Sequence, residues 1–135
     1  FSALLKFDNE LAHKTIAGGD FLLMPSRFEP CGLSQMYAMQ YGTIPIVRST
    51  GGLGDSVPVC HEDLSKGCGF NFSNIAAIEI MNLIIQASEC YTEKKQVFLS
   101  MQNNGMKMDF SWTVSAEKYE SIYGWAMDAR MQAFE

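Results

Sequence analysis

Apolar runs and helical patterns alternate along the first half of the chain. Asp8 is a typical helix N-cap, and apolar residues follow it at helical spacing as far as Gly18, which ends the pattern. Residues 21–24 form an unbroken apolar run closed by Pro25, too short for a helix and without polar alternation. This pattern is typical of a strand buried on both faces.

The same order then repeats once. A second helix is expected to begin near Gly32 and to end at Gly42, where glycine terminates the apolar spacing. Residues 43–47 form a second apolar strand. Within it, Pro45 must stand where the sheet needs no N–H donor.

Further along, a glycine-rich turn is expected over residues 49–54 and a short third strand over 69–72. The rest of the chain is predicted to be helical, over 75–90, over roughly 93–106 and after a cap at Ser111. Strands that alternate with helices predict a parallel, Rossmann-like α/β sheet with right-handed crossovers. Ligands of such sheets bind where strands end at their carboxyl edge, which here indicates the loops 25–34 and 48–55.

Composition narrows the class of protein. The chain has 135 residues, of which 47% are hydrophobic and 19% charged, so it is an ordinary folded domain over 1–135. Its apolar runs are too short for a membrane span, and a net charge of −5 argues against a nucleic-acid or membrane partner. Because the chain opens at Phe1 without a methionine, we expect it to be a piece of a longer protein.

The four cysteines are not spaced as a zinc motif. Cys60, His61 and Cys68 could supply three ligands, but a fourth would have to come from elsewhere. We therefore expect no metal site, and reduced thiols in a reducing compartment.

The loop over 25–34 leads into a helix N-terminus, where free N–H groups and the helix dipole suit an anion such as phosphate. Ser34 adds a hydroxyl donor. Glu29 would repel phosphate and is better placed to accept hydrogen bonds from the hydroxyls of a sugar beyond it. A surface carboxylate, or one paired with Arg27, is an equally open interpretation.

The second loop carries Gly51 and Gly52, whose backbone could also cradle an anion, although a tight turn explains two glycines equally well. The chain contains no G-x-G-x-x-G, no P-loop motif and no G-x-S-x-G. The sequence therefore indicates neither a dinucleotide fold, nor a P-loop ATPase, nor a serine hydrolase.

Two segments nevertheless resemble a known family. The stretch PSRFEPCGLSQMYAMQYGTIPIV, followed by STGGLGDSV, resembles the C-terminal domain of bacterial glycogen synthases and of plant or algal starch synthases. FDNELAHKTIAGGDFLLM and MDFSWTVSAEKY resemble the flanking helices of the same family, so the resemblance covers nearly the whole chain. It implies half of a two-domain GT-B enzyme, a retaining glucosyltransferase that moves glucose from ADP-glucose to an α-1,4-glucan without metal or cofactor.

The resemblance also implies roles for individual residues. Glu29 corresponds to the family carboxylate that hydrogen-bonds the donor glucose and supports an oxocarbenium-like transition state. Tyr37 stands where many related transferases have a second Glu, which favours the glycogen and starch synthase branch, and His13 matches a common His without an assigned role. The residues expected to bind the donor are Phe7 (against the adenine), Cys31, Gly32, Leu33, Ser34, Gly51 and Gly52.

The resemblance implies that the cationic pair for the diphosphate lies upstream of Phe1, and that an absent N-terminal domain holds the glucan cleft and the rest of the active site. The two loops offer only Arg27 and Arg48 as cations. We therefore expect the chain alone to bind ADP-glucose or ADP weakly and to transfer no glucose. The implied compartment is intracellular, a plastid in a plant or alga and the cytoplasm in a bacterium.

Two other functions stay open, a non-catalytic scaffold with the same fold and a flavodoxin-like protein that binds a phosphorylated ligand. Trp112 and Trp125 could serve as platforms for a glucan. Their helical spacing instead favours packing in the core or at a domain interface.

Overall fold

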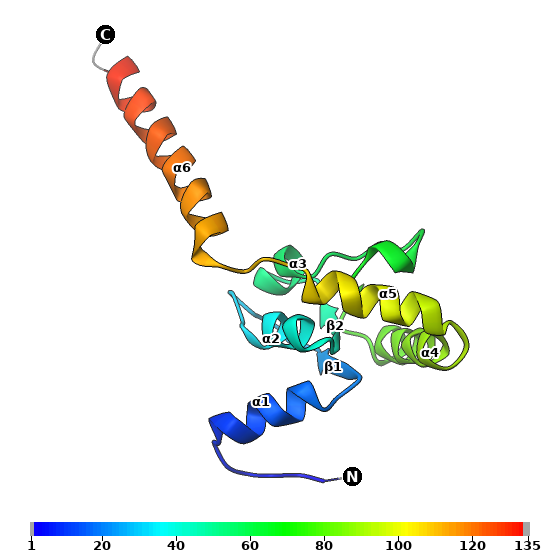
Figure 1. The fold of residues 1–135 in the computed structure, drawn as a ribbon. Coiled ribbons are helices and arrows are strands. Elements are labelled where there is room, and N and C mark those ends of the chain that lie inside the picture. Colours follow the sequence, from blue (N-terminus) through cyan, green and yellow to red (C-terminus); the bar gives the residue numbers. More distant parts are fainter. Residues whose placement is uncertain (1, 134–135) are drawn as a thin grey trace.

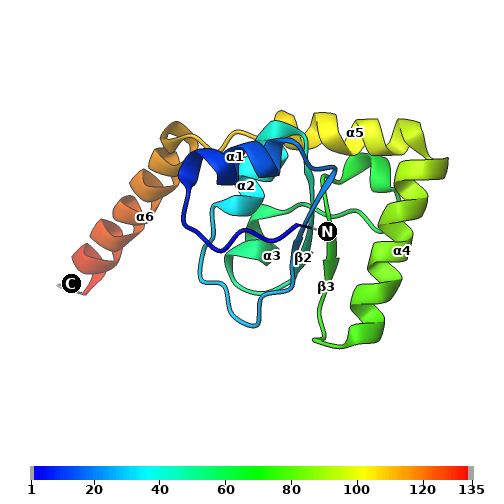
Figure 2. The same ribbon diagram turned by 90° about the horizontal axis from the view of Figure 1, so that it is seen from below.

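The computed structural model describes residues 2–133, which form three parallel strands flanked by helices (Figures 1 and 2). The sheet order is β1-β2-β3, so β2 is central and β1 lies at an edge. The predicted Rossmann-like α/β class is thereby confirmed. In chain order the elements are α1 (Asn9–Ala17), β1 (Phe21–Met24), α2 (Ser34–Tyr41), β2 (Ile44–Arg48), α3 (Gly52–Ser56), the 3-10 turn η1 (Leu64–Lys66), β3 (Phe70–Phe72), α4 (Ala77–Glu93), α5 (Lys95–Met106) and α6 (Trp112–Gln132).

Each face of the sheet has its own apolar cluster, because neighbouring side chains of a strand point to opposite faces. Ile44 and Ile46 pack with Phe70 of β3 and with residues of α4 and α5. Val47 belongs to the second cluster, which includes Met39 of α2 and residues in and after α3. The sheet thus lies between α4 and α5 on one side and α2 and α3 on the other.

Pro45 fits the central strand because its nitrogen points where no partner strand has begun. Ile44 donates its N–H to the carbonyl of Asp20, next to β1, so the following nitrogen points toward β3. The register of β3 begins only at Phe70, opposite Ile46. The predicted position of Pro45 is therefore confirmed.

One predicted feature of the first strand is wrong. β1 is not buried on both faces, since Leu23 is 43% exposed on this edge strand, in a groove between β1 and α4 that Ile84 also lines. The second helix, predicted to begin near Gly32, begins at Ser34, because Gly32 has a φ of 72°, outside the right-handed helical range. The glycine-rich turn also contains the short helix α3, which the glycine pattern does not indicate.

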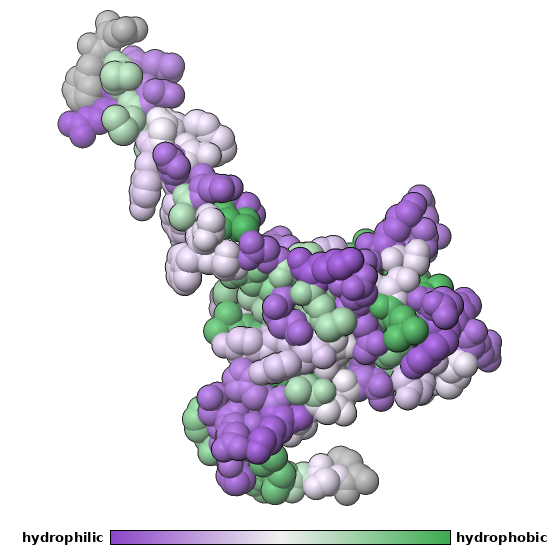
Figure 3. Space-filling view, viewed as in Figure 1, coloured by the Kyte–Doolittle hydropathy of each residue, from purple (hydrophilic) through white to green (hydrophobic). Residues whose placement is uncertain are grey.

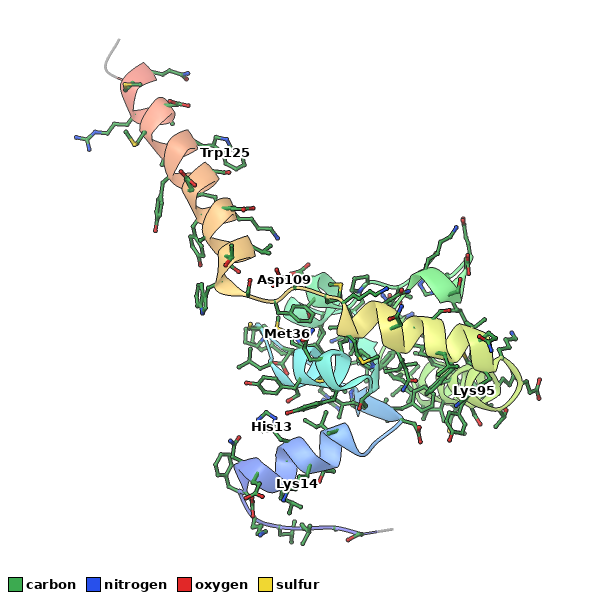
Figure 4. The ribbon with its side chains drawn as sticks, in the orientation of Figure 1. His13, Lys14, Met36, Lys95, Asp109 and Trp125 are labelled. Carbon is green, nitrogen blue, oxygen red and sulfur yellow. The ribbon has the colours of Figure 1, made fainter. Side chains whose placement is uncertain are left out.

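Helix α6 projects away from the rest of the structure and has no buried residue (Figures 1 and 3). Trp112 is 79% exposed and Trp125 is 70% exposed, so neither packs in a core of the described residues, and their packing at a domain interface stays a prediction. Figure 4 shows Trp125 far from the sheet, on the distal half of the helix. Its apolar residues have few neighbours because no other element of the described chain reaches along the helix.

One buried thiol should make stability sensitive to alkaline pH. Burial raises the pKa of the Cys68 thiol from 9.0 to about 11. Since the folded pKa exceeds the unfolded one, the unfolded chain loses this proton first, and stability falls as pH rises from 9 to 11. We expect Cys68 to contribute a loss of about 1.4 kcal/mol at pH 10 relative to pH 7. Urea unfolding of the parent and of Cys68→Ala at both pH values checks this, and an equal loss in the two proteins would contradict it.

Candidate functional site

The two predicted loops meet at the carboxyl edge of the sheet, the lower edge in Figure 2. The N–H of Gly52 donates to the carbonyl of Glu29 at 3.2 Å. A Cβ added to Gly51 would lie 2.1 Å from that carbonyl oxygen, and one added to Gly52 would lie 2.4 Å from the carbonyl oxygen of Cys31. The two glycines therefore allow one backbone to lie directly on the other.

Arg48 holds the same edge together from the end of β2. Its Nη1 donates to the carbonyls of Arg27 at 2.6 Å and Ser26 at 3.4 Å, and its Nε donates to the carbonyl of Ser73 at 3.1 Å. These carbonyls belong to the segments that follow β1 and β3. The sequence suggested Arg48 as a free cation for a diphosphate, whereas the structure shows its guanidinium bound to three backbone oxygens.

Glu29 lies half-buried beside the start of α2. Its Cδ and Oε1 are each 3.3 Å from the position that a Cβ on Gly32 would take. Among residues 2–133 the ion pairs do not include one between Glu29 and Arg27, so that alternative is not seen. The carboxylate is thus turned toward the helix N-terminus, where the first-turn N–H groups of α2 have no partner within the helix.

The remaining predicted donor residues are only partly brought together. Cys31 and Leu33 are exposed on the same loop, and Ser34 is the first residue of α2. Phe7 is 98% exposed and lies before α1, along a separate groove that α1 lines, so the structure does not bring it to the two loops. Its predicted contact with adenine stays a prediction.

His13 connects α1 to α2. Its Nδ1 lies 3.0 Å from the hydroxyl of Tyr41, and its ring lies 4.8 Å from the ring of Tyr37, measured between centroids. Figure 4 shows His13 on the side of α1 that faces α2. These contacts support the structural interpretation of His13 that its mid-helix position favours.

Two polar residues of this edge were missed in the sequence. Gln35 is fully buried in the first turn of α2, and Ser56 ends α3. The Nε2 of Gln35 donates to Ser56 Oγ at 3.0 Å, which connects the two loops through side chains. A glutamine among the apolar residues of the helix does not identify a partner, and the same helix carries a second glutamine, Gln40.

Known proteins similar to this chain belong to the same family that its sequence motifs resemble. No family model matches the chain. A glycogen synthase of Lachnospira eligens is 46% identical over 122 residues, which are 90% of this chain and 26% of that protein. The soluble starch synthase 1 of Solanum tuberosum, named chloroplastic/amyloplastic, is 45% identical over 130 residues, which are 93% of this chain and 20% of that protein. This chain is a homologue of part of the glycogen and starch synthases.

The fold of this chain agrees with that similarity. The catalytic domain of starch synthase IV from Arabidopsis thaliana, solved with ADP and acarbose, matches it with a TM-score of 0.80 and 38% identity. The match covers 93% of this chain and 26% of the Arabidopsis chain. The segment therefore spans about a quarter of the length of the relatives that it matches.

The described residues form neither a metal site nor a membrane-spanning helix. Within residues 2–133, no three His, Cys, Asp or Glu side chains gather as they would around a metal ion, and Cys60, His61 and Cys68 form no such group. None of the described helices combines the length and apolar character needed to span a bilayer.

Proposed function

We propose that the chain forms the donor-binding part of an ADP-glucose-dependent glucosyltransferase that elongates an α-1,4-glucan. The observation that carries the proposal is the contact between the loop of Glu29 and the loop of Gly51 and Gly52 at the carboxyl edge of the sheet. This edge is where α/β sheets bind ligands. Homology to glycogen and starch synthases, one of them solved with ADP, supplies the class of ligand.

Two kinds of group in the site would bind different parts of the donor. The first turn of α2 offers backbone N–H groups and a positive dipole end, which favour the diphosphate. Glu29 offers carboxylate oxygens, which accept hydrogen bonds from the hydroxyls of the glucose. In a retaining transferase the same carboxylate would also stabilise positive charge that develops on the sugar ring.

The chain supplies only one side of such a site. Arg48 is bound to backbone carbonyls, so the loops leave Arg27 as their exposed cation, too little to neutralise a diphosphate. The segment corresponds to about a quarter of its relatives. We propose that the remaining polypeptide supplies the cations and the glucan site, and that this chain alone binds the donor weakly and transfers no glucose.

Glu29→Gln should separate recognition of the sugar from recognition of the nucleotide. The amide keeps the size of the side chain but loses the charge that strengthens hydrogen bonds to hydroxyls. We expect the Kd for ADP-glucose to rise about tenfold, the equivalent of one charge-assisted hydrogen bond, while the Kd for ADP changes less than about twofold. Titration followed by ¹⁵N NMR reaches the millimolar range in which this chain is expected to bind.

Glu62→Gln is the matched control, because Glu62 is an exposed carboxylate outside both loops. It should leave both affinities at the parent values. Binding of FMN in preference to ADP-glucose would favour the flavodoxin-like alternative. Glucosyl transfer to glycogen by the purified chain would contradict the proposal that its site is incomplete.

A further inference from the structure

Gln35 is a buried polar side chain to which neither homology nor the proposed chemistry gives a role. It is 0% exposed, in the first turn of α2. Its Nε2 donates to the carbonyls of Gly32 at 2.9 Å and Cys31 at 3.1 Å, and to Ser56 Oγ at 3.0 Å. Because two of these atoms can only accept, the amide nitrogen must face them and the side chain has a single orientation.

The amide oxygen of Gln35 therefore points to the other side, toward Glu29. A Cβ on Gly32 would lie 2.9 Å from Gln35 Oε1 and 3.3 Å from the carboxyl carbon of Glu29, so both groups border the same space. Within the described part of the chain, this oxygen is buried and has no hydrogen-bond partner. A buried acceptor without a partner is costly, which indicates that this amide is not retained for stability alone.

A ring of hydrogen bonds connects Gln35 to the backbone of Glu29. From Gln35 the ring passes to Ser56, whose hydroxyl donates to the carbonyl of Gly52 at 2.5 Å. The N–H of Gly52 then donates to the carbonyl of Glu29 at 3.2 Å. On the other side, Gln35 donates to the carbonyl of Gly32, and the carboxyl group of Glu29 borders the open Cβ side of the same glycine.

We propose that Gln35 is a positioning residue that fixes the carboxylate of Glu29 relative to the glycine loop. The ring holds both loops in one arrangement before the ligand arrives, so the hydroxyls of a donor sugar meet an acceptor that is already in place. The ligand in this inference rests on the proposed function, whereas the ring rests on the contacts of the chain itself.

Gln35→Met tests the inference, because methionine keeps the length of the side chain but has no N–H to donate. We expect the Kd for ADP-glucose to rise about tenfold and the Kd for ADP to stay within about threefold, since Glu29 contacts the sugar. We also expect the amide proton of Gly52 to exchange with solvent about tenfold faster, measured by NMR hydrogen exchange.

Gln40→Met is the matched control. Gln40 also donates from α2 to a backbone carbonyl, that of Met108 at 2.8 Å, but from the last turn of the helix rather than the first. It should leave the two affinities and the exchange of Gly52 unchanged. Ser56→Ala breaks the ring without placing a new side chain in the core, so it gives the same readouts if Gln35→Met does not fold.

The two measurements separate failure of this inference from failure of the proposed function. Equal weakening of ADP and ADP-glucose by the Gln35 variant would overturn the positioning role, because it would indicate general damage to the site. If the parent chain binds neither ADP nor ADP-glucose, the proposed function fails. The positioning role of Gln35 is then tested by the hydrogen exchange of the Gly52 amide alone. Parent-like exchange in both Gln35→Met and Ser56→Ala would then overturn the inference.

Discussion

Replacing Gly51 with alanine is expected to lower the free energy of unfolding by about 4 kcal/mol. Gly51 has a φ of 46°, which L-residues with a side chain rarely adopt, and its new Cβ would lie 2.1 Å from the carbonyl oxygen of Glu29. Backbone strain of this kind costs about 1–3 kcal/mol, and overpacking costs a similar amount. Urea unfolding followed by circular dichroism measures the change.

Gly124→Ala is the control for the same substitution in an open position. Gly124 lies inside α6, and an added Cβ has no atom within 4 Å. Since alanine favours helix over glycine, the variant should be slightly more stable than the parent, by less than about 1 kcal/mol. If Gly51→Ala were as stable as the parent, the direct contact between the two loop backbones would be wrong.

Arg48→Met should produce the second large loss, about 3 kcal/mol. Methionine keeps most of the apolar stem but removes every donor to the carbonyls of Ser26, Arg27 and Ser73. Hydrogen bonds from a charged donor contribute about 1.5–3 kcal/mol each, and water replaces part of that at a half-exposed position. Urea unfolding again gives the loss, and faster hydrogen exchange in residues 26–28 would locate it.

Arg27→Met removes the same charge from an exposed neighbour. It should change the free energy of unfolding by no more than about 0.5 kcal/mol, as is usual for surface substitutions. A comparable loss in the two variants would show that net charge, rather than the bonds from Arg48 to the backbone, stabilises this edge.

Local chemistry made the first elements predictable. Asp8 accepts from the N–H of Leu11 and Gly18 caps the other end, so both ends of α1 agree with the sequence. β1 also has its predicted bounds, because the glycines before Asp20 end α1 and Pro25 follows the last residue of the strand. The sequence did not predict which other elements pack against each helix or strand, because these contacts depend on the rest of the fold.

Leu23 illustrates that limit. An apolar run predicts burial only when other elements cover both sides of the strand, and β1 lies at the edge of the sheet. The exposed tryptophans of α6 follow the same logic, since helical spacing predicts an apolar face but not what covers it.

The position of the site could be predicted from the sequence, but the side chains that hold its loops together could not. The rule for parallel sheets places Glu29 and Gly51 at one edge, and the structure brings their backbones into contact. The roles of Gln35, Ser56 and Arg48 could not be predicted, because they bind mostly backbone carbonyls. Every residue has a carbonyl, so a sequence pattern does not show which ones a side chain will reach.

The contact between the two loops has a consequence for motion. Gly52 donates directly to Glu29, and no intervening side chain could lengthen or rotate to let the loops separate. A rotation of this part of the polypeptide against another domain would therefore carry the carboxylate and the glycine turn as one rigid body. We therefore expect any hinge to lie outside residues 25–56, so that opening the site would change its access to solvent but not its internal spacing.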